Sequence, residues 1–124
     1  EHELGGEYDV AHGAGLCALW SSWAHYVKDA APKRFFKFAV NVMGVDPKDK
    51  TDKEVIDLGI SEVNRFYRDI SMPTNLVELG LNLSDDEMMK LALKCSDNDT
   101  HTTGRVVELT SKDIFNIYKA ASKN

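Results

Sequence analysis

Two histidines near the start of the chain have the residue type and the spacing that best suit chemistry. The segment HELGGEYDVAHG begins at His2 and contains His12 just before its last residue. Imidazole both binds Fe²⁺ or Zn²⁺ and exchanges a proton near neutral pH. On one straight helix, a separation of ten residues would place them roughly 15 Å apart. The Gly5-Gly6 pair predicts a chain reversal between them, because glycine readily ends a helix in a left-handed turn. Across such a reversal the two imidazoles can converge.

The element that must position His12 is the apolar stretch that follows it. Residues 14–28, AGLCALWSSWAHYVK, place apolar side chains at three- and four-residue steps, which is typical of a central helix with a wide buried face. Trp20 and Trp23 lie within this pattern, which favours core packing over a role as a cofactor platform. Before the reversal, residues from His2 to Leu4 have the pattern of the last turn of another helix.

The rest of the chain predicts helices and no convincing strand. Apolar periodicity indicates helices at 32–43, at about 52–71, from Ser84 to about Ser96, and from Thr110 or Ser111 to Ser122. Thr51 or Asp52 can cap the second of these, with Glu54 placed for a capping box to Thr51, and Thr74 can cap a single turn that ends at Gly80. The polar segment 97–105 is expected to be a mobile loop. Residues 1–124 are therefore predicted to form a single all-α domain, a helical bundle.

Composition limits the possible partners and the compartment. The net charge is −5 and the basic residues are scattered along the chain, so the footprint of a nucleic-acid-binding protein is absent. No apolar run reaches the ~20 residues that a spanning helix needs, and no signal-peptide pattern opens the sequence. Cys17 and Cys95 show no metal-binding or redox spacing. We expect two reduced core thiols in a cytoplasmic protein that binds neither nucleic acid nor membrane.

The histidine segment and the helix after it resemble a known family. The stretches HELGG, YDVAHGAGL and LWSSWAHYV are similar to the iron-containing alcohol dehydrogenases, most of all to their butanol dehydrogenase branch. That family has an HxxxH pair on a helix and, after nine further residues, a third histidine that opens the next helix as HG. His2 matches the second member of the pair and His12-Gly13 the third histidine with its glycine, whereas the first member would lie four residues before His2.

This resemblance implies a fold, a chemistry and two site residues. The chain would be the C-terminal helical domain, of the dehydroquinate-synthase-like α-type, in a two-domain NAD(P)-dependent enzyme that interconverts alcohols with aldehydes or ketones. His12 would be a metal ligand, sharing Fe²⁺, or Zn²⁺, with an aspartate and two further histidines outside the chain. His2 would be the catalytic residue and the cofactor-binding residue, lying beside the metal, the nicotinamide and the substrate.

The resemblance also implies that much of the enzyme is missing. An N-terminal nucleotide-binding domain would hold most of the NAD(P)H, so the present fragment is expected to bind no cofactor tightly and to be inactive alone. Apolar surface that faces the other domain would favour a homo-oligomer. The exact alcohol and the choice between NAD and NADP stay open.

A second interpretation treats the chain as a free-standing helical protein-interaction module with structural histidines. Asp9 lies three residues before His12 and is a weaker ligand candidate, because its segment is predicted to be a loop. His25 on a helix surface and His101 in a polar loop have little to suggest a function. Glu3 is expected to be a solvated residue at a helix end, and no HExxH zinc-protease motif is present.

Overall fold

The computed structural model describes residues 1–123, and its regular elements are all helical, as the sequence predicted. They are α1 (His2–Tyr8), α2 (His12–Val27), the 3-10 turn η1 (Lys28–Ala30), α3 (Pro32–Asn41), α4 (Asp52–Asp69), α5 (Asp85–Cys95) and α6 (Ser111–Ala121). Within this described part, β structure is limited to one isolated antiparallel bridge between Thr103 and Leu109. None of the described helices combines the length and the apolar character needed to span a membrane.

The later helices begin where their capping residues predicted. At the start of α4, the Glu54 backbone N–H donates to Thr51 Oγ1 at 3.2 Å, and the Thr51 backbone N–H donates back to the Glu54 carboxylate at 3.3 Å. The same reciprocal capping box opens α5 at Ser84 and α6 at Thr110. Each box satisfies two backbone donors that a helix start would otherwise leave unpaired, so these starts are fixed locally.

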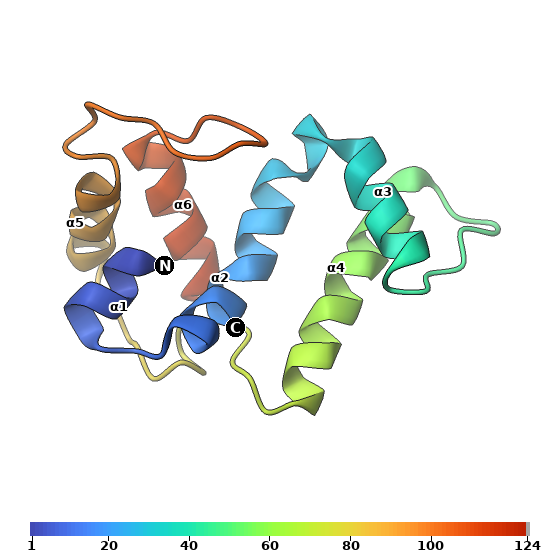
Figure 1. The fold of residues 1–124 in the computed structure, drawn as a ribbon, viewed down its shortest axis with the longest axis horizontal. Coiled ribbons are helices and arrows are strands. Elements are labelled where there is room, and N and C mark those ends of the chain that lie inside the picture. The colour runs from blue at the N-terminus through green and yellow to red at the C-terminus, as the bar shows by residue number, and fades with distance from the viewer. Residues whose placement is uncertain (124) are drawn as a thin grey trace.

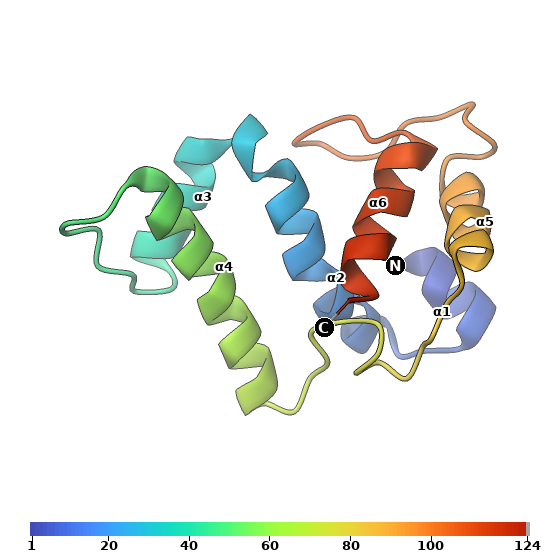
Figure 2. The same ribbon diagram turned by 180° about the vertical axis from the view of Figure 1, so that it is seen from behind.

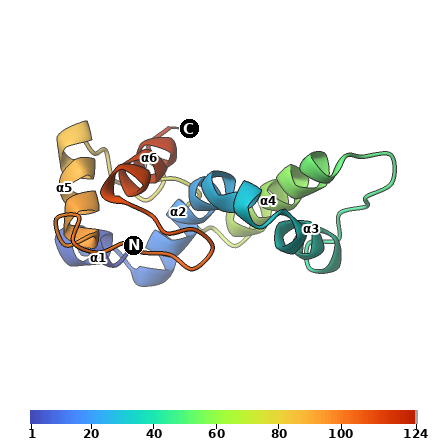
Figure 3. The same cartoon turned by 90° about the horizontal axis from the view of Figure 1, so that it is seen from above.

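Helix α2 is the central element of the molecule. Figure 1 shows it between a group formed by α1, α5 and α6 and a pair formed by α3 and α4, and the view from behind in Figure 2 shows the same division. Seen from above, the helices extend in a row with α2 in the middle (Figure 3). Helix α2 therefore contacts α1 and α6 on one side and α4 on the other.

Each side of α2 has its own buried cluster. The larger one joins α1, α5, α6 and the segment before α5; its members include Leu4, Leu76, Met88, Leu91, Ile114 and Tyr118. The smaller one joins α2 to α4 through Ala24, Ile56 and Ile60, with Trp20, Trp23, Phe35 and Phe36 packed against it. Trp20 and Trp23 thus pack against this cluster, with ring centroids 6.0 Å from Phe38 and 6.2 Å from Phe35, but both are only partly buried.

Some local expectations were wrong. The helix predicted to reach residue 43 ends at Asn41, and the one predicted to reach 71 ends at Asp69. The turn before Gly80 is capped by Asn75, whose side-chain oxygen accepts from the Glu78 backbone N–H at 2.8 Å. Thr74 instead donates to the Glu78 carboxylate. The face of α2 is also less buried than its apolar pattern suggested, because Leu16 is 48% exposed.

Candidate functional site

The chain reverses between α1 and α2, but not at the predicted residues. Gly5 and Gly6 both lie inside α1, which runs to Tyr8. The reversal begins at Asp9, which adopts the left-handed conformation with φ 52° and donates its backbone N–H to the Gly5 carbonyl at 3.1 Å. Aspartate tolerates this conformation better than most residues, so it ends the helix in the role that the sequence assigned to glycine.

The reversal brings the two predicted site histidines together. His2 opens α1 and His12 opens α2, and their ring centroids lie 5.4 Å apart with the planes inclined by 26°. Both residues are exposed to solvent. The expected convergence is therefore present, although another residue produces the turn.

A third residue joins this pair, and sequence reasoning missed it. The Glu1 carboxylate is hydrogen-bonded through Oε2 to Nδ1 of His12. One candidate ligand atom from each of Glu1, His2 and His12 lies within 4.8 Å of the others. Gly15 was the available signal, because a glycine inside an apolar helix often marks a close approach by another group.

The donors in this cluster fit a metal ion of the kind that the sequence suggested. Imidazole nitrogens are ligands that Fe²⁺ and Zn²⁺ accept, and a carboxylate beside them either binds the ion or orients a ligand ring. The engaged Nδ1 of His12 leaves Nε2 as its free coordinating atom, and the His12 side chain is 61% exposed. The Glu1 side chain, by contrast, is only 7% exposed, and its Oε1 is buried without a hydrogen-bond partner in the described residues. Burying an unpaired carboxylate oxygen costs free energy, and the fold accepts that cost beside His12.

The weaker sequence candidates lie elsewhere or have structural roles. Asp9 ends α1 and does not belong to the histidine cluster. His25 lies 3.4 Å from Lys28 Nζ and 3.9 Å from the Asp57 carboxylate, and burial followed by the Lys28 charge lowers its pKa. His101 is exposed in the loop after α5.

The two cysteines are free thiols, as expected. Cys17 is buried in α2, and burial raises the pKa of its thiol. Cys95 is half-buried at the end of α5, where burial again raises the pKa. A raised pKa reduces the thiolate fraction at neutral pH, so neither residue has the properties of a reactive cysteine.

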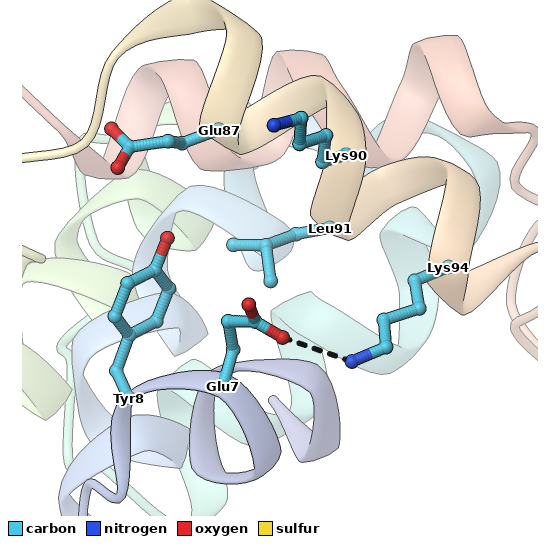
Figure 4. A pocket seen from close by; sticks show the side chains of 6 residues that line it. All are labelled: Glu7, Tyr8, Glu87, Lys90, Leu91 and Lys94. Carbon is cyan, nitrogen blue, oxygen red and sulfur yellow. Dashed lines mark hydrogen bonds and ion pairs between the residues drawn. The ribbon is translucent and has the colours of Figure 1, made fainter.

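A charged pocket of about 410 Å³ lies between α1 and α5. Figure 4 shows Glu7 and Tyr8 of α1 facing Glu87, Lys90 and Lys94 of α5 across it. An ion pair of 3.0 Å between Lys94 and Glu7 joins the two helices. The lining of this pocket holds two carboxylates and two ammonium groups, so the pocket lacks a bias toward an anionic or a cationic ligand.

A more apolar groove of about 450 Å³ lies between α2, α6 and the loop 97–110. Its lining includes Leu16, Leu19, Trp20, Trp23, Ile114 and Ile117, and Glu1 borders it. The exposure of Leu16 is explained by this groove, because the side chain lines an open apolar surface instead of the core. Such a surface commonly meets another protein segment or a ligand.

Comparison with known proteins identifies relatives of one kind. The profile of the Fe-containing alcohol dehydrogenase family, C-terminal, matches residues 1–122. A probable NADH-dependent butanol dehydrogenase of Bacillus subtilis is 30% identical over 98% of this chain, and a 1,3-propanediol dehydrogenase of Citrobacter freundii is 31% identical over 97%. The chain spans about 30% of the length of each.

The solved structures agree with the sequence matches. The NADH-dependent butanol dehydrogenase A of Thermotoga maritima superposes with a TM-score of 0.83 at 26% identity, covering 98% of this chain and 31% of that one. Similarity of sequence and similarity of fold therefore extend over the same residues. The chain belongs to the iron-containing alcohol dehydrogenase family, in the region that the family profile describes as C-terminal.

Proposed function

We propose that this chain is the metal-binding helical part of an NAD(P)-dependent alcohol dehydrogenase that interconverts small alcohols with aldehydes or ketones. The observation that carries the proposal is the convergence of His2 and His12 at the start of α1 and α2 in a member of this family. The relatives named above as butanol and propanediol dehydrogenases support a small alcohol as the substrate.

In this proposal His12 is the metal ligand that the chain supplies. Its Nε2 is free, and its side chain is exposed on the surface where residues from outside the chain can complete the coordination. Those residues would be the aspartate and two histidines that the resemblance implies. When bound, Fe²⁺ or Zn²⁺ would act as a Lewis acid toward the substrate oxygen.

His2 acts beside His12 in this proposal. Its exposed imidazole stacks on the His12 ring, so it can contact the nicotinamide and the substrate from the open side of the site. An imidazole in that position can hold or pass the alcohol proton. His2 would thus be the catalytic and cofactor-contacting residue of the chain.

The remaining partners follow from the same proposal. A nucleotide-binding domain outside residues 1–124 would hold most of the NAD(P)H and close the cleft over the histidines. The apolar groove beside Glu1 would contribute to contacts with that domain or between subunits of a homo-oligomer. A nicotinamide-dependent enzyme of this kind would work in the cytoplasm.

The experiment compares His12→Ala with His2→Ala in the full-length enzyme that the proposal implies. Loss of His12 should remove both bound metal and turnover, because the remaining ligands hold the ion less tightly and in altered geometry. Loss of His2 should leave the metal content near normal and lower kcat by about 10²-fold if it transfers a proton. Metal stoichiometry is measured alongside the steady-state rate. Metal retained without His12, or lost without His2, would refute the assignment.

The second candidate function is a helical interaction module, and the open apolar groove between α2 and α6 favours it. In such a module the two histidines are structural. Both His12→Ala and His2→Ala would then lower the unfolding temperature without changing metal content. Equal metal content in the wild type and both variants, at the level of background, would favour the module.

A further inference from the structure

The buried carboxylate of Glu1 beside the exposed His12 is a feature that the proposed ligand role alone does not explain. Its side chain is 7% exposed, whereas that of His12 is 61% exposed. Oε2 contacts Nδ1 of His12, and Oε1 is buried with no hydrogen-bond partner in residues 1–123. Burying a carboxylate with one satisfied oxygen costs free energy, and the fold maintains it at this position.

Gly15 makes room for this carboxylate. A Cβ built on Gly15 would lie 2.5 Å from Glu1 Oε1, 2.9 Å from Cγ and 3.1 Å from Cδ. The Glu1 side chain therefore crosses directly over the Gly15 backbone in the second turn of α2. A helical glycine costs about 1 kcal/mol relative to alanine. Two locally unfavourable choices, a helical glycine and a buried carboxylate, thus meet at one contact.

That contact determines which nitrogen of His12 carries the proton. A carboxylate oxygen accepts from an imidazole N–H, so in a neutral imidazole, the form that binds a metal, Nδ1 is the donor and Nε2 has the free lone pair. Neither Glu1 oxygen is open to an ion approaching from solvent, because Oε2 is occupied by His12 and Oε1 is buried. Glu1 therefore suits orientation of the imidazole better than direct coordination.

We infer that Glu1, held over Gly15, is a positioning residue that fixes the His12 ring with Nε2 facing the metal. The inference rests on the proposed role of His12 as a ligand. Histidine ligands commonly donate their second ring N–H to a carboxylate, which fixes the tautomer and raises metal affinity. It gives functions to Glu1 and Gly15.

The test uses the metal-free full-length enzyme that the proposed function implies, with Zn²⁺ alone as the probe. Glu1→Gln keeps the shape of the side chain and removes its charge. Gly15→Ala keeps the carboxylate and displaces it, at small cost because the carboxylate is the end of a flexible side chain. Glu7→Gln is the matched control, since it removes a carboxylate of α1 that pairs with Lys94 and not with a histidine.

Two readouts separate positioning from mere stability. Imidazole ¹⁵N shifts of His12 without metal report its tautomer, and Zn²⁺ titration followed by the same signals reports affinity. We expect the wild type and Glu7→Gln to show the Nδ1–H tautomer, and both Glu1→Gln and Gly15→Ala to populate the Nε2–H form. Zn²⁺ affinity should fall by about tenfold or more in those two variants and stay unchanged in the control.

The outcomes distinguish this inference from the proposed function. An unchanged tautomer in Glu1→Gln and Gly15→Ala would overturn the positioning role, whatever the Zn²⁺ affinity. An equal loss of affinity in Glu7→Gln would overturn it as well, because a general charge effect would then suffice. If His12→Ala binds Zn²⁺ as well as the wild type, His12 is not a ligand, and the inference about metal positioning fails with that role. A tautomer shift in Glu1→Gln would then show only that Glu1 contacts His12.

Discussion

The contact between α3 and α4 at Gly59 and Ala39 provides a quantitative test of the packing. A Cβ built on Gly59 would overlap the Ala39 Cβ and lie 2.9 Å from the Ala39 Cα. Ala39 is fully buried, and both of these atoms are fixed to helix backbone, so no flexible side chain can move aside. Gly59→Ala should therefore force the two helices apart.

The loss of stability expected for Gly59→Ala is the difference between two opposing contributions. Overpacking of a buried contact costs 1–3 kcal/mol, and the rigid backbone here places the cost near the upper value, about 3 kcal/mol. Alanine recovers about 1 kcal/mol of helix propensity relative to glycine. The net loss in the free energy of unfolding is about 2 kcal/mol. Ala39→Gly alone should also destabilise, because it loses propensity and the burial of a methyl group.

The assay is urea unfolding of the wild type, the two single variants and the double variant. In the double variant the Cβ–Cβ overlap is absent but the approach to the residue-39 Cα persists. The double variant should recover part of the stability that Gly59→Ala loses, with a coupling energy between the two substitutions of about 1 kcal/mol or more. Stabilisation by Gly59→Ala, or additivity of the two substitutions, would refute the close approach of α3 and α4.

Three further predictions concern charge, association and activity. The Tyr26 hydroxyl, together with the Thr110 backbone N–H, lowers the pKa of Asp113 in the folded state. Asp113 therefore stabilises the fold fully above its pKa in the unfolded chain, and this stabilisation is lost as the pH falls through its lower pKa in the folded state. Asp113→Asn should lower stability at pH 7 and flatten its decline below about pH 4, as followed by thermal melts; an unchanged decline would contradict this. The apolar groove should promote self-association of the chain at high concentration. Leu16→Glu should weaken this association, whereas Val42→Glu should not, because Val42 is 67% exposed and lies outside the groove. A strict monomer in sedimentation would count against this prediction. The isolated chain should fold but fail to reduce nicotinamide with butanol, because the implied metal site and nucleotide domain are incomplete; measurable turnover would show that this expectation is wrong.

The helices and their starts were determined locally, and the sequence therefore predicted them well. The boxes at Thr51, Ser84 and Thr110 join a side chain and a backbone group three residues apart, so no distant contact is needed to recognise them. Helix ends were less predictable. α3 and α4 both stop two residues before the expected position, a difference of the size by which helix ends fray.

The candidate site was likewise predicted in part: its residues were identified from the sequence, but the residue that makes its turn was not. The residue types and the resemblance sufficed to select His2 and His12, and the need for a reversal followed from helix geometry alone. The residue that makes the turn is Asp9 and not Gly5-Gly6. A glycine permits the left-handed conformation but does not require it, so α1 continues through Gly5 and Gly6 with its helical hydrogen bonds intact.

Only the tertiary structure revealed the contacts of Glu1 and the open face of α2. Glu1 meets Gly15 and His12 because α1 folds back on α2, a contact between residues with no periodic relation in the sequence. Leu16 has the spacing of a core residue, yet it lines a groove. Periodicity identifies which residues share a helix face, whereas the packing of the other helices decides whether that face is covered.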